Sequence, residues 1–205
     1  MSQGPYSDIV ARLFPGAELE AVEPLTGGVS ADVSRLDVRL ADGDTTRLVL
    51  RAHGASHSGH SAELEYRLLE ALHRSGVPVA EPLLLDASGR LLADPFLVMK
   101  FVEGTTAIPA GQEGRYIDLM AEVLAQIHAL PTRDLPALPA RVDPRPDVFD
   151  YLPEGREWAA LRAYLRALAD TTYTGPPRLL HGDFWPENLL WRNGSVAAIL
   201  DWEDG

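Results

Sequence analysis

The sequence predicts an α+β protein whose strands lie mostly before Gly104 and whose helices lie mostly after it. Before Gly104, short apolar runs alternate with polar residues and are separated by turn residues such as Asp42-Gly43. After it, apolar residues keep helical spacing over about four turns, from 116 to 127. Two apolar runs then flank Asn193-Gly194, the dipeptide most typical of a tight β-hairpin. We therefore expect two lobes, residues 1–102 and 103–205.

Composition excludes several classes of protein. The 205 residues are 46% hydrophobic and 23% charged, which is typical of a globular domain. The net charge of −12 argues against nucleic acid as a partner, because its phosphates would be repelled. There is no cysteine for a disulfide or a thiolate metal site. No signal pattern opens the chain, and no apolar run approaches the roughly 20 residues that cross a bilayer. The sequence thus predicts a cytoplasmic protein that does not bind membranes.

The first half begins with a predicted helix over 7–14, which ends at Pro15-Gly16. Two strands are expected near 36–40 and 48–51, and a glycine pair precedes them. This pair lies in a strand–loop–strand hairpin rather than before a helix, which excludes a P-loop and a dinucleotide fingerprint. Such a loop can still lie over phosphates, because glycine lets backbone N–H groups come close. The alternative is a plain hairpin turn.

A helix is expected over 61–74, before the breakers Gly76 and Pro78. Its leucines form one arc, and Glu65 falls inside that arc. A carboxylate on a buried face needs a cation beside it, and Arg51 is the nearest candidate in the sequence. The alternative places Glu65 at the helix end, in water. Further strands are expected at 83–85, 91–92 and 96–102.

Three histidines, His53, His57 and His60, lie in a segment rich in glycine and serine before this helix. Nothing in the sequence fixes their geometry, so a mobile polar loop is expected rather than a metal site.

The second half is predicted to be mainly helical. After the helix over 116–127 comes an irregular proline-rich segment, 131–146. Residues 155–170 then form a second amphipathic helix. Its inward face is expected to consist of Trp158, Leu161, Leu165 and Leu168.

The hairpin around Asn193-Gly194 makes a prediction about chemistry. A two-residue turn would place Trp191 opposite Val196 and Asn188 opposite Ile199. Asp201 would then share a sheet face with Asn188, as its diagonal neighbour. One amide oxygen and one carboxylate on that face suit Mg²⁺, which prefers oxygen ligands.

Asp183 lies in the loop before this hairpin, between Gly182 and Pro186. A carboxylate on a rigid loop beside a metal site can accept a proton or orient a nucleophile. The spacing His181-x-Asp183-x-x-x-x-Asn188, followed by Asp201 on a strand, is the constellation that kinases use for phosphoryl transfer.

The stretches from His181 to Leu190 and from Ile199 to Glu203 resemble the aminoglycoside phosphotransferase family of small-molecule kinases, and the likeness extends over nearly the whole chain. The resemblance implies a protein-kinase-like two-lobe fold, with Asp183 as the catalytic carboxylate and Asn188 and Asp201 as ligands of Mg²⁺. It implies that Glu65 pairs with the strand cation Arg51, where many kinases have lysine. The phosphates of the nucleotide would lie under Thr26, Gly27, Gly28, Val29 and Ser30. Adenine would bind the backbone of a hinge formed by Lys100, Phe101 and Val102.

Members of this family normally continue beyond the last residue of this sequence, so the helical lobe is expected to be incomplete. The expected activity is transfer of the γ-phosphate of ATP, or of GTP, to a hydroxyl of a small molecule. Aminoglycosides, macrolides, choline, amino alcohols and sugars are all acceptors of kinases of this type. Two alternatives are a nucleotide-binding, pseudokinase-like remnant without turnover, and a metal hydrolase that uses His181, Asp183 and Asp201.

Overall fold

The computed structural model describes residues 4–25, 31–54, 57, 59–140, 155–168 and 174–205. It forms two compact units. The first consists of Met1–Pro136 and Arg178–Gly205, and the second of Ala137–Pro177. Thr26, Gly27, Gly28, Val29 and Ser30 lie outside the described residues.

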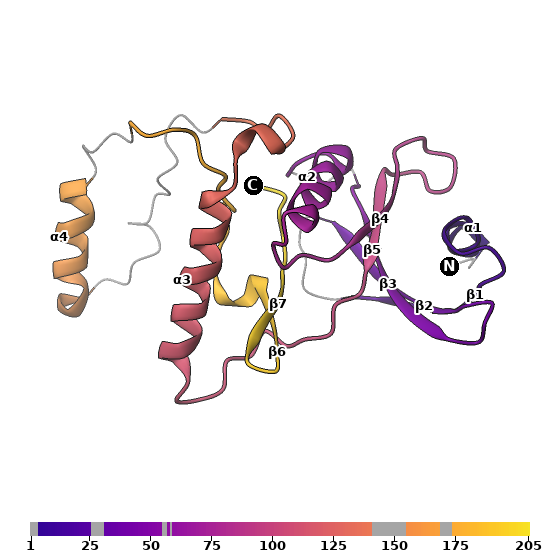
Figure 1. Ribbon diagram of the computed structural model, residues 1–205, viewed down its shortest axis with the longest axis horizontal. Helices are drawn as coiled ribbons and strands as arrows, with labels where there is room; N and C mark the ends of the chain where they lie inside the picture. The colour runs from indigo at the N-terminus through magenta and orange to yellow at the C-terminus, as the bar shows by residue number, and fades with distance from the viewer. Residues whose placement is uncertain (1–3, 26–30, 55–56, 58, 141–154, 169–173) are drawn as a thin grey trace. The chain divides into compact units, whose positions relative to one another are not determined.

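The first unit contains a five-stranded sheet in the order β1-β2-β3-β5-β4 (Figure 1). Every pair of neighbouring strands in it is antiparallel, as an α+β fold requires. Its strands are β1 (Glu18–Pro24), β2 (Asp32–Arg39), β3 (Thr45–Ala52), β4 (Pro82–Asp86) and β5 (Phe96–Lys100). The segment with the glycine pair thus connects two antiparallel neighbours, β1 and β2, and the expected strand–loop–strand arrangement is confirmed.

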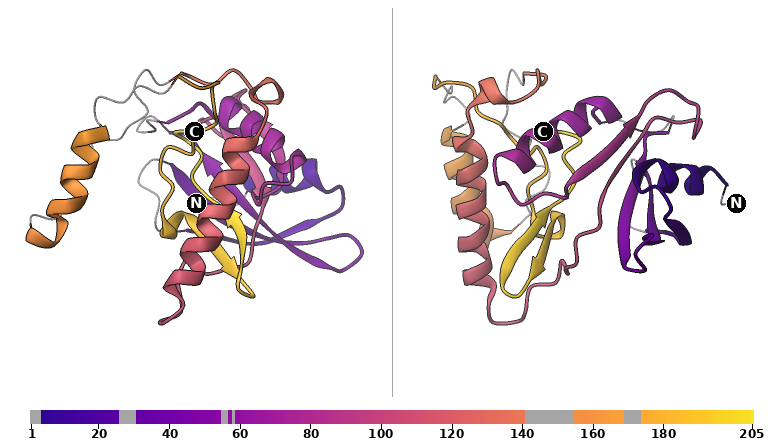
Figure 2. Two further views of the ribbon diagram at one scale, coloured as in Figure 1. Left: turned by 60° about the vertical axis from the view of Figure 1, so that its left-hand side comes forward. Right: turned by 45° about the vertical axis from the view of Figure 1, so that its right-hand side comes forward.

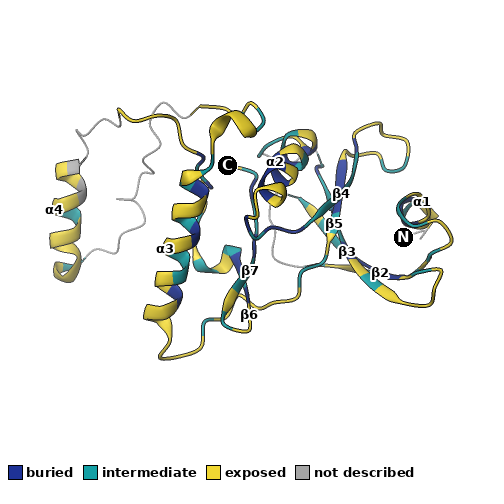
Figure 3. Cartoon of the chain, in the orientation of Figure 1, coloured by how far each residue is buried: buried dark blue, intermediate teal, exposed yellow. Residues whose placement is uncertain are grey.

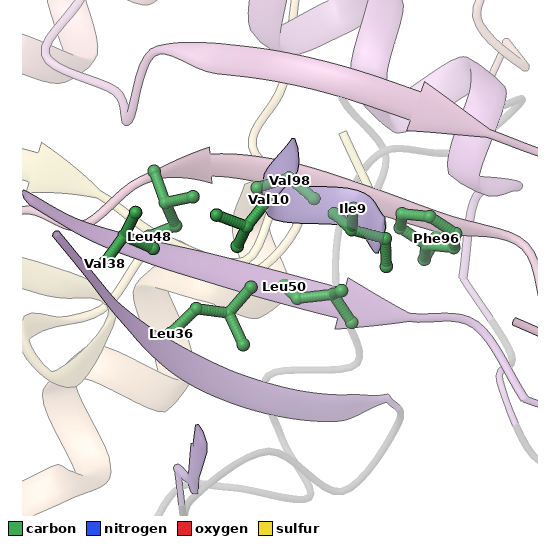
Figure 4. Packing of buried hydrophobic residues seen from close by; sticks show 8 residues of the cluster. All are labelled: Ile9, Val10, Leu36, Val38, Leu48, Leu50, Phe96 and Val98. Carbon is green, nitrogen blue, oxygen red and sulfur yellow. The ribbon is translucent and has the colours of Figure 1, made fainter. Parts of the chain in front are cut away.

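The helix α1 (Gly4–Leu13) covers one face of this sheet. Its two buried residues, Ile9 and Val10, pack on alternate residues of three strands, which point to one face because side chains alternate along a strand. These strand residues are Leu36, Val38, Leu48, Leu50, Phe96 and Val98 (Figure 4). Arg51, the neighbour of Leu50, therefore faces the other side of the sheet.

On that other side lies α2 (Ala62–Arg74), which packs on β4 and β5. Ser61 caps it, and its Oγ accepts a hydrogen bond from the N–H of Leu64 at 3.3 Å. Leu68, Leu69 and Leu72 of the predicted arc are buried, and Glu65 is buried with them, whereas Leu64 is half-buried. Figure 1 shows α1 and α2 on opposite sides of the sheet.

The chain then leaves the sheet and forms α3 (Glu113–Ala129), which lies beside a two-stranded hairpin in Figures 1 and 2. The hairpin consists of β6 (Leu189–Arg192) and β7 (Ser195–Ile199). Tyr116 of α3 packs on Leu189 and Trp191, and the rings of Tyr116 and Trp191 are 4.5 Å apart. This cluster fixes the hairpin against α3.

The turn of the hairpin is the predicted one, with φ of 54° at Asn193 and 74° at Gly194. Trp191 lies opposite Val196, as expected. The register then shifts by one residue, so that Leu189, and not Asn188, faces Ile199. The predicted pairing of Asn188 with Ile199 was wrong because a bulge inserts one extra residue into β7.

Two further expectations were wrong. Leu91 and Leu92 form no strand; they are partly buried against the core beneath α1. In the second unit, α4 (Ala159–Leu168) follows a short 3-10 turn, η2 (Arg156–Trp158). Trp158 and Leu161 are 36% and 39% exposed there instead of facing inward. Most of the ribbon of α4 is coloured as exposed in Figure 3. The side chains of Leu165 and Leu168 lie outside the described part.

Two short 3-10 turns complete the first unit, η1 (Thr132–Asp134) and η3 (Pro186–Asn188). Within the residues that the structure describes, no helix is both long and apolar enough to cross a membrane.

Candidate functional site

Asp183 is held by Asn188, five residues further along the chain. The side-chain amide of Asn188 donates hydrogen bonds to Asp183 Oδ2 at 3.0 Å and to the backbone oxygen of Asp183 at 2.9 Å. The turn η3 brings the two residues together, and its first bond runs from the N–H of Asn188 to the oxygen of Trp185 at 3.1 Å. Because both acceptors are oxygens, the amide nitrogen of Asn188 points at Asp183 and its carbonyl oxygen remains a possible metal ligand.

Asp201 follows β7 at the point where the chain leaves the hairpin. The N–H of Leu200 donates to the backbone oxygen of Asn188 at 2.8 Å, so Asp201 is the next residue after the cross-strand partner of Asn188. Asp201 has φ of 60°, in the left-handed region that few residues other than glycine adopt. The alternation of side chains therefore ends here, and the diagonal placement predicted from the strand does not apply. Such backbone strain is common at functional sites.

The guanidinium of Arg51 joins Asp201 to two other acidic side chains. Arg51 Nη2 lies 3.2 Å from Asp201 Oδ1 and also donates to Glu203. Arg51 Nε lies 3.4 Å from Glu65 Oε2. Only 12% of the Arg51 side chain and 4% of the Glu65 side chain are exposed. The expected pair is present, and the alternative that Glu65 reaches water is wrong.

Burial is the main reason why the pKa of the Asp201 carboxyl lies above its ordinary value. Arg51 opposes this shift, whereas the nearby carboxylates of Glu203 and Glu65 add to it. Three acidic groups thus approach one guanidinium, and a second cation beside Asp201 would offset the repulsion between their carboxylates.

Sequence reasoning missed a second basic neighbour of Glu65. His53 Nε2 lies 2.9 Å from Glu65 Oε2, and both side chains are 4% exposed. Neither this contact nor that from Arg51 Nε has the geometry of a hydrogen bond. His53 follows the last residue of β3, two positions after Arg51, and strand alternation continued by one residue is the signal that could have found it.

His181 is buried, and both of its ring nitrogens are engaged. Nε2 donates to the oxygen of Leu200 at 2.8 Å, and Nδ1 accepts from the N–H of Asp183 at 3.3 Å. Its ring lies 4.5 Å from the ring of Trp202. No nitrogen is left for a metal, which argues against the hydrolase alternative. Across the described part of the chain, no group of three or more His, Cys, Asp or Glu side chains is arranged to hold a metal ion.

Two of the three hinge residues use their N–H groups within the protein. The N–H of Lys100 donates to the oxygen of Glu81 at 2.9 Å, and that of Phe101 to the oxygen of Arg47 at 3.0 Å. Of the predicted hinge, Val102 is therefore the candidate donor to a nucleotide base. At the other side of the sheet, the N–H of Leu25 donates to the oxygen of Val33 at 2.9 Å, which closes the hairpin around the undescribed loop 26–30.

The profile of the "Phosphotransferase enzyme family" matches residues 22–205, nearly the whole chain. The chain belongs to this family. Among its curated relatives is the mouse protein "Acyl-CoA dehydrogenase family member 10", with 31% identity over 193 residues. That match covers 81% of this chain but 17% of the mouse protein, so the chain spans about a sixth of the relative's length.

Solved structures of phosphotransferases share the fold. A macrolide 2'-phosphotransferase from Brachybacterium faecium superposes with a TM-score of 0.58 and 21% identity, over 98% of this chain and 72% of that one. A spectinomycin phosphotransferase, solved with ADP and spectinomycin, gives a TM-score of 0.61 and 15% identity, over 100% and 69%. At these identities the likeness concerns the fold. It confirms the protein-kinase-like fold, and the chain spans 72% and 69% of the length of these two neighbours.

In this member of the phosphotransferase family, the buried His181 should make folding sensitive to acid. Burial lowers the pKa of His181 below its ordinary 6.5, so the unfolded chain takes up the proton first. The stabilisation is therefore complete above pH 6.5 and is lost as the pH falls through the pKa of the folded state. In urea unfolding between about pH 5 and 8, we expect His181→Gln to reduce the loss of unfolding free energy on the acid side. The exposed His73→Gln is the control, and equal acid slopes for both variants would contradict this assignment.

Proposed function

We propose that this phosphotransferase family member transfers the γ-phosphate of ATP to a hydroxyl group of a small molecule. The observation that carries the proposal is the continuous contact from Asp183 through Asn188 to the Arg51 cluster. Asn188 bonds the Asp183 carboxylate with its amide, and its backbone oxygen bonds Leu200, next to Asp201. Asp201 in turn contacts Arg51, which reaches Glu65 of α2. The residues that we propose as base, as oxygen donors to the metal and as phosphate-binding cation thereby follow one another in this chain of contacts.

In the proposed reaction, Asp183 is the general base. Its carboxylate accepts the proton of the acceptor hydroxyl while that oxygen forms a bond to the γ-phosphorus. The bond from the γ-phosphorus to the bridging oxygen breaks, and ADP leaves with the electron pair. The bond from the Asn188 amide keeps the carboxylate of Asp183 in place. Because the amide holds Oδ2, Oδ1 is the oxygen that we assign to the acceptor.

Arg51 is proposed to hold the phosphates of the nucleotide. Its guanidinium presents a planar fork that suits phosphate oxygens. In the structure this fork faces Asp201 and Glu203, while Glu65 approaches from α2. An anionic nucleotide would add negative charge to a cluster that already has three carboxylates, so a divalent cation must accompany it.

The residues present fit Mg²⁺. Asp201 offers a carboxylate and Asn188 a carbonyl oxygen, and Mg²⁺ prefers such oxygen ligands. The side chain of Asp201 is 35% exposed, which leaves it accessible beside its contact with Arg51. When bound, the ion would neutralise charge that develops on the phosphates during transfer.

The nucleotide is proposed to lie against the face of the sheet that carries Arg51. The N–H of Val102 would bond the base, and Thr26, Gly27, Gly28, Val29 and Ser30 would cover the phosphates. Lys100 and Phe101 would complete the hinge through their backbone oxygens. Because the base would meet only backbone groups, GTP is an alternative donor.

The acceptor is proposed to be a hydroxylated small molecule. The neighbouring enzymes are named for macrolides and spectinomycin, which are such compounds. The net charge of −12 favours cationic acceptors such as amino alcohols and aminoglycosides. A nucleotide-binding remnant without turnover is the alternative, and the presence of Asp183, Asn188 and Asp201 together supports turnover.

Release of ADP from ATP with Mg²⁺ tests the proposal. The 205-residue chain is incubated with panels of aminoglycosides, macrolides, amino alcohols and sugars, and ADP is measured with and without each acceptor. Acceptor-dependent ADP release, with phosphate found on the acceptor by mass spectrometry, is the expected result. Tight Mg²⁺-dependent ATP binding with no release for any class would instead favour the remnant.

A further inference from the structure

The histidine-rich segment after β3 holds the end of the described chain. His57, Gly59 and His60, which we call the histidine clamp, contact Glu203, and His60 also reaches Gly205. Two residues of the expected polar loop, His57 and His60, therefore have partners at the other end of the described chain. No local sequence pattern predicts these contacts, because they join positions more than 140 residues apart.

Two hydrogen bonds from His60 hold the segment 203–205. Its backbone N–H donates to the oxygen of Glu203 at 2.8 Å. Its Nε2 lies 2.6 Å from the oxygen of Gly205 and donates there. His57 supports this arrangement, since its Nε2 lies 2.6 Å from the oxygen of His60 and its Nδ1 lies 3.8 Å from Glu203 Oε2.

Glycine permits a close approach at two positions of the segment 203–205. A Cβ atom at Gly59 would lie 2.4 Å from the Cβ of Glu203 and 2.9 Å from its backbone oxygen. A Cβ at Gly182 would likewise lie 2.6 Å from the Cβ of Asp204. Real side-chain atoms do not come so close, so any other residue at Gly59 must push Glu203 away.

We infer that the histidine clamp positions Asp201 for the metal–nucleotide complex. Asp201 stands in a left-handed conformation between two anchors. Upstream, the N–H groups of Ile199 and Leu200 are bonded to Pro78 and Asn188. Downstream, the clamp holds Glu203 and Gly205, and Glu203 binds Arg51, the same guanidinium that contacts Asp201. This inference rests on the proposed role of Asp201 as a metal ligand.

His57, Gly59 and His60 would thus be positioning residues and not ligands. Residues that orient a metal ligand typically cost about 10–100-fold in metal affinity when they are changed. Loss of the clamp should therefore lower the nucleotide affinity measured with Mg²⁺. The affinity measured without Mg²⁺ should stay close to wild type. A residue that only stabilises the fold would weaken both alike.

The test measures ADP affinity calorimetrically, with and without Mg²⁺. Gly59→Ala introduces the clash, and His60→Leu removes the bond to Gly205. His60→Gln restores a donor near the position of Nε2. Gly114→Ala is the control for the glycine, because a Cβ there meets nothing within 4 Å. His73→Leu on the exposed end of α2 is the control for the histidine.

We expect Gly59→Ala and His60→Leu to weaken Mg²⁺-dependent ADP binding by about tenfold or more, and His60→Gln and both controls to retain it. Hydrogen exchange of the His60 amide, which the bond to Glu203 protects, should quicken in Gly59→Ala. If Gly59→Ala does not fold, the Mg²⁺-dependent ADP affinities of His60→Leu and His60→Gln are compared instead, because neither substitution adds a clash.

Faster exchange together with unchanged Mg²⁺-dependent binding would overturn the positioning role, and so would an equal loss with and without Mg²⁺. These outcomes leave the proposed function standing. A wild-type chain whose ADP binding is indifferent to Mg²⁺ would instead overturn the proposed function, and the positioning role with it.

Discussion

Asp183→Asn should lower phosphoryl-transfer turnover by about 10²–10⁴-fold, which is the usual contribution of a positioned general base. The affinity for ATP should stay close to wild type, because Asp183 addresses the acceptor hydroxyl and not the nucleotide. Asparagine keeps the shape of the side chain, and its oxygen can still accept the bond from Asn188. The turnover number and the KM for ATP are measured with the best acceptor of the panel.

Asp118→Asn, on the exposed face of α3, is the matched control for this change. Turnover of Asp183→Asn within a few-fold of the control would show that Asp183 is not the base.

The second large effect concerns Arg51, which three carboxylates approach. Arg51→Met leaves Glu65, Asp201 and Glu203 without the guanidinium between them. Removal of one partner of a buried ion pair costs about 3–5 kcal/mol of unfolding free energy, because the other charge stays buried. We expect a loss of this order at neutral pH, measured by urea unfolding. Addition of Mg²⁺ should recover part of it, since the ion would supply positive charge beside Asp201.

The exposed pair of Arg67 and Glu63 provides the control for Arg51. The two side chains meet at 2.6 Å on successive turns of α2 but are 63% and 54% exposed. Arg67→Met should therefore cost about 0.3–0.5 kcal/mol. If Arg51→Met is no more costly than Arg67→Met, the buried cluster does not depend on Arg51 for its charge balance.

Local signals in the sequence predicted much of the fold. The helix expected over 61–74, before Gly76 and Pro78, forms as α2, and Asn193-Gly194 forms the tight turn because both residues tolerate positive φ. The burial of Glu65 followed from its place among the leucines of α2, and its pairing with Arg51 followed from the cost of a lone buried charge. Each of these inferences needs only a few neighbouring residues.

The parts that the sequence did not predict depend on contacts between distant segments. The bulge in β7 shifts the cross-strand pairing of Asn188 by one position, and no residue type in the hairpin predicts this bulge. Asp201 has a positive φ just after β7, so strand alternation does not give the direction of its side chain. The contact of His60 with Glu203 joins two distant segments, and neither sequence contains a pattern that predicts the other as its partner. Packing of the chain onto itself decides all three.

The exposure of Trp158 and Leu161 has a different cause. Their spacing on α4 is that of an amphipathic helix, so the sequence predicts an inward face. Spacing identifies which residues share a face, but it does not identify what lies against that face.

Mg²⁺-dependent nucleotide binding to the wild type and three variants tests the central claim most directly. A non-hydrolysable ATP analogue is titrated with and without Mg²⁺ into wild type, Asp183→Asn, Asn188→Ala and Asp201→Ala. We predict that Mg²⁺ strengthens binding to wild type and to Asp183→Asn alike, that Asp201→Ala loses this gain, and that Asn188→Ala falls between. Loss of the gain in Asp183→Asn together with its retention in Asp201→Ala would contradict the account, because the roles of the two carboxylates would then be reversed.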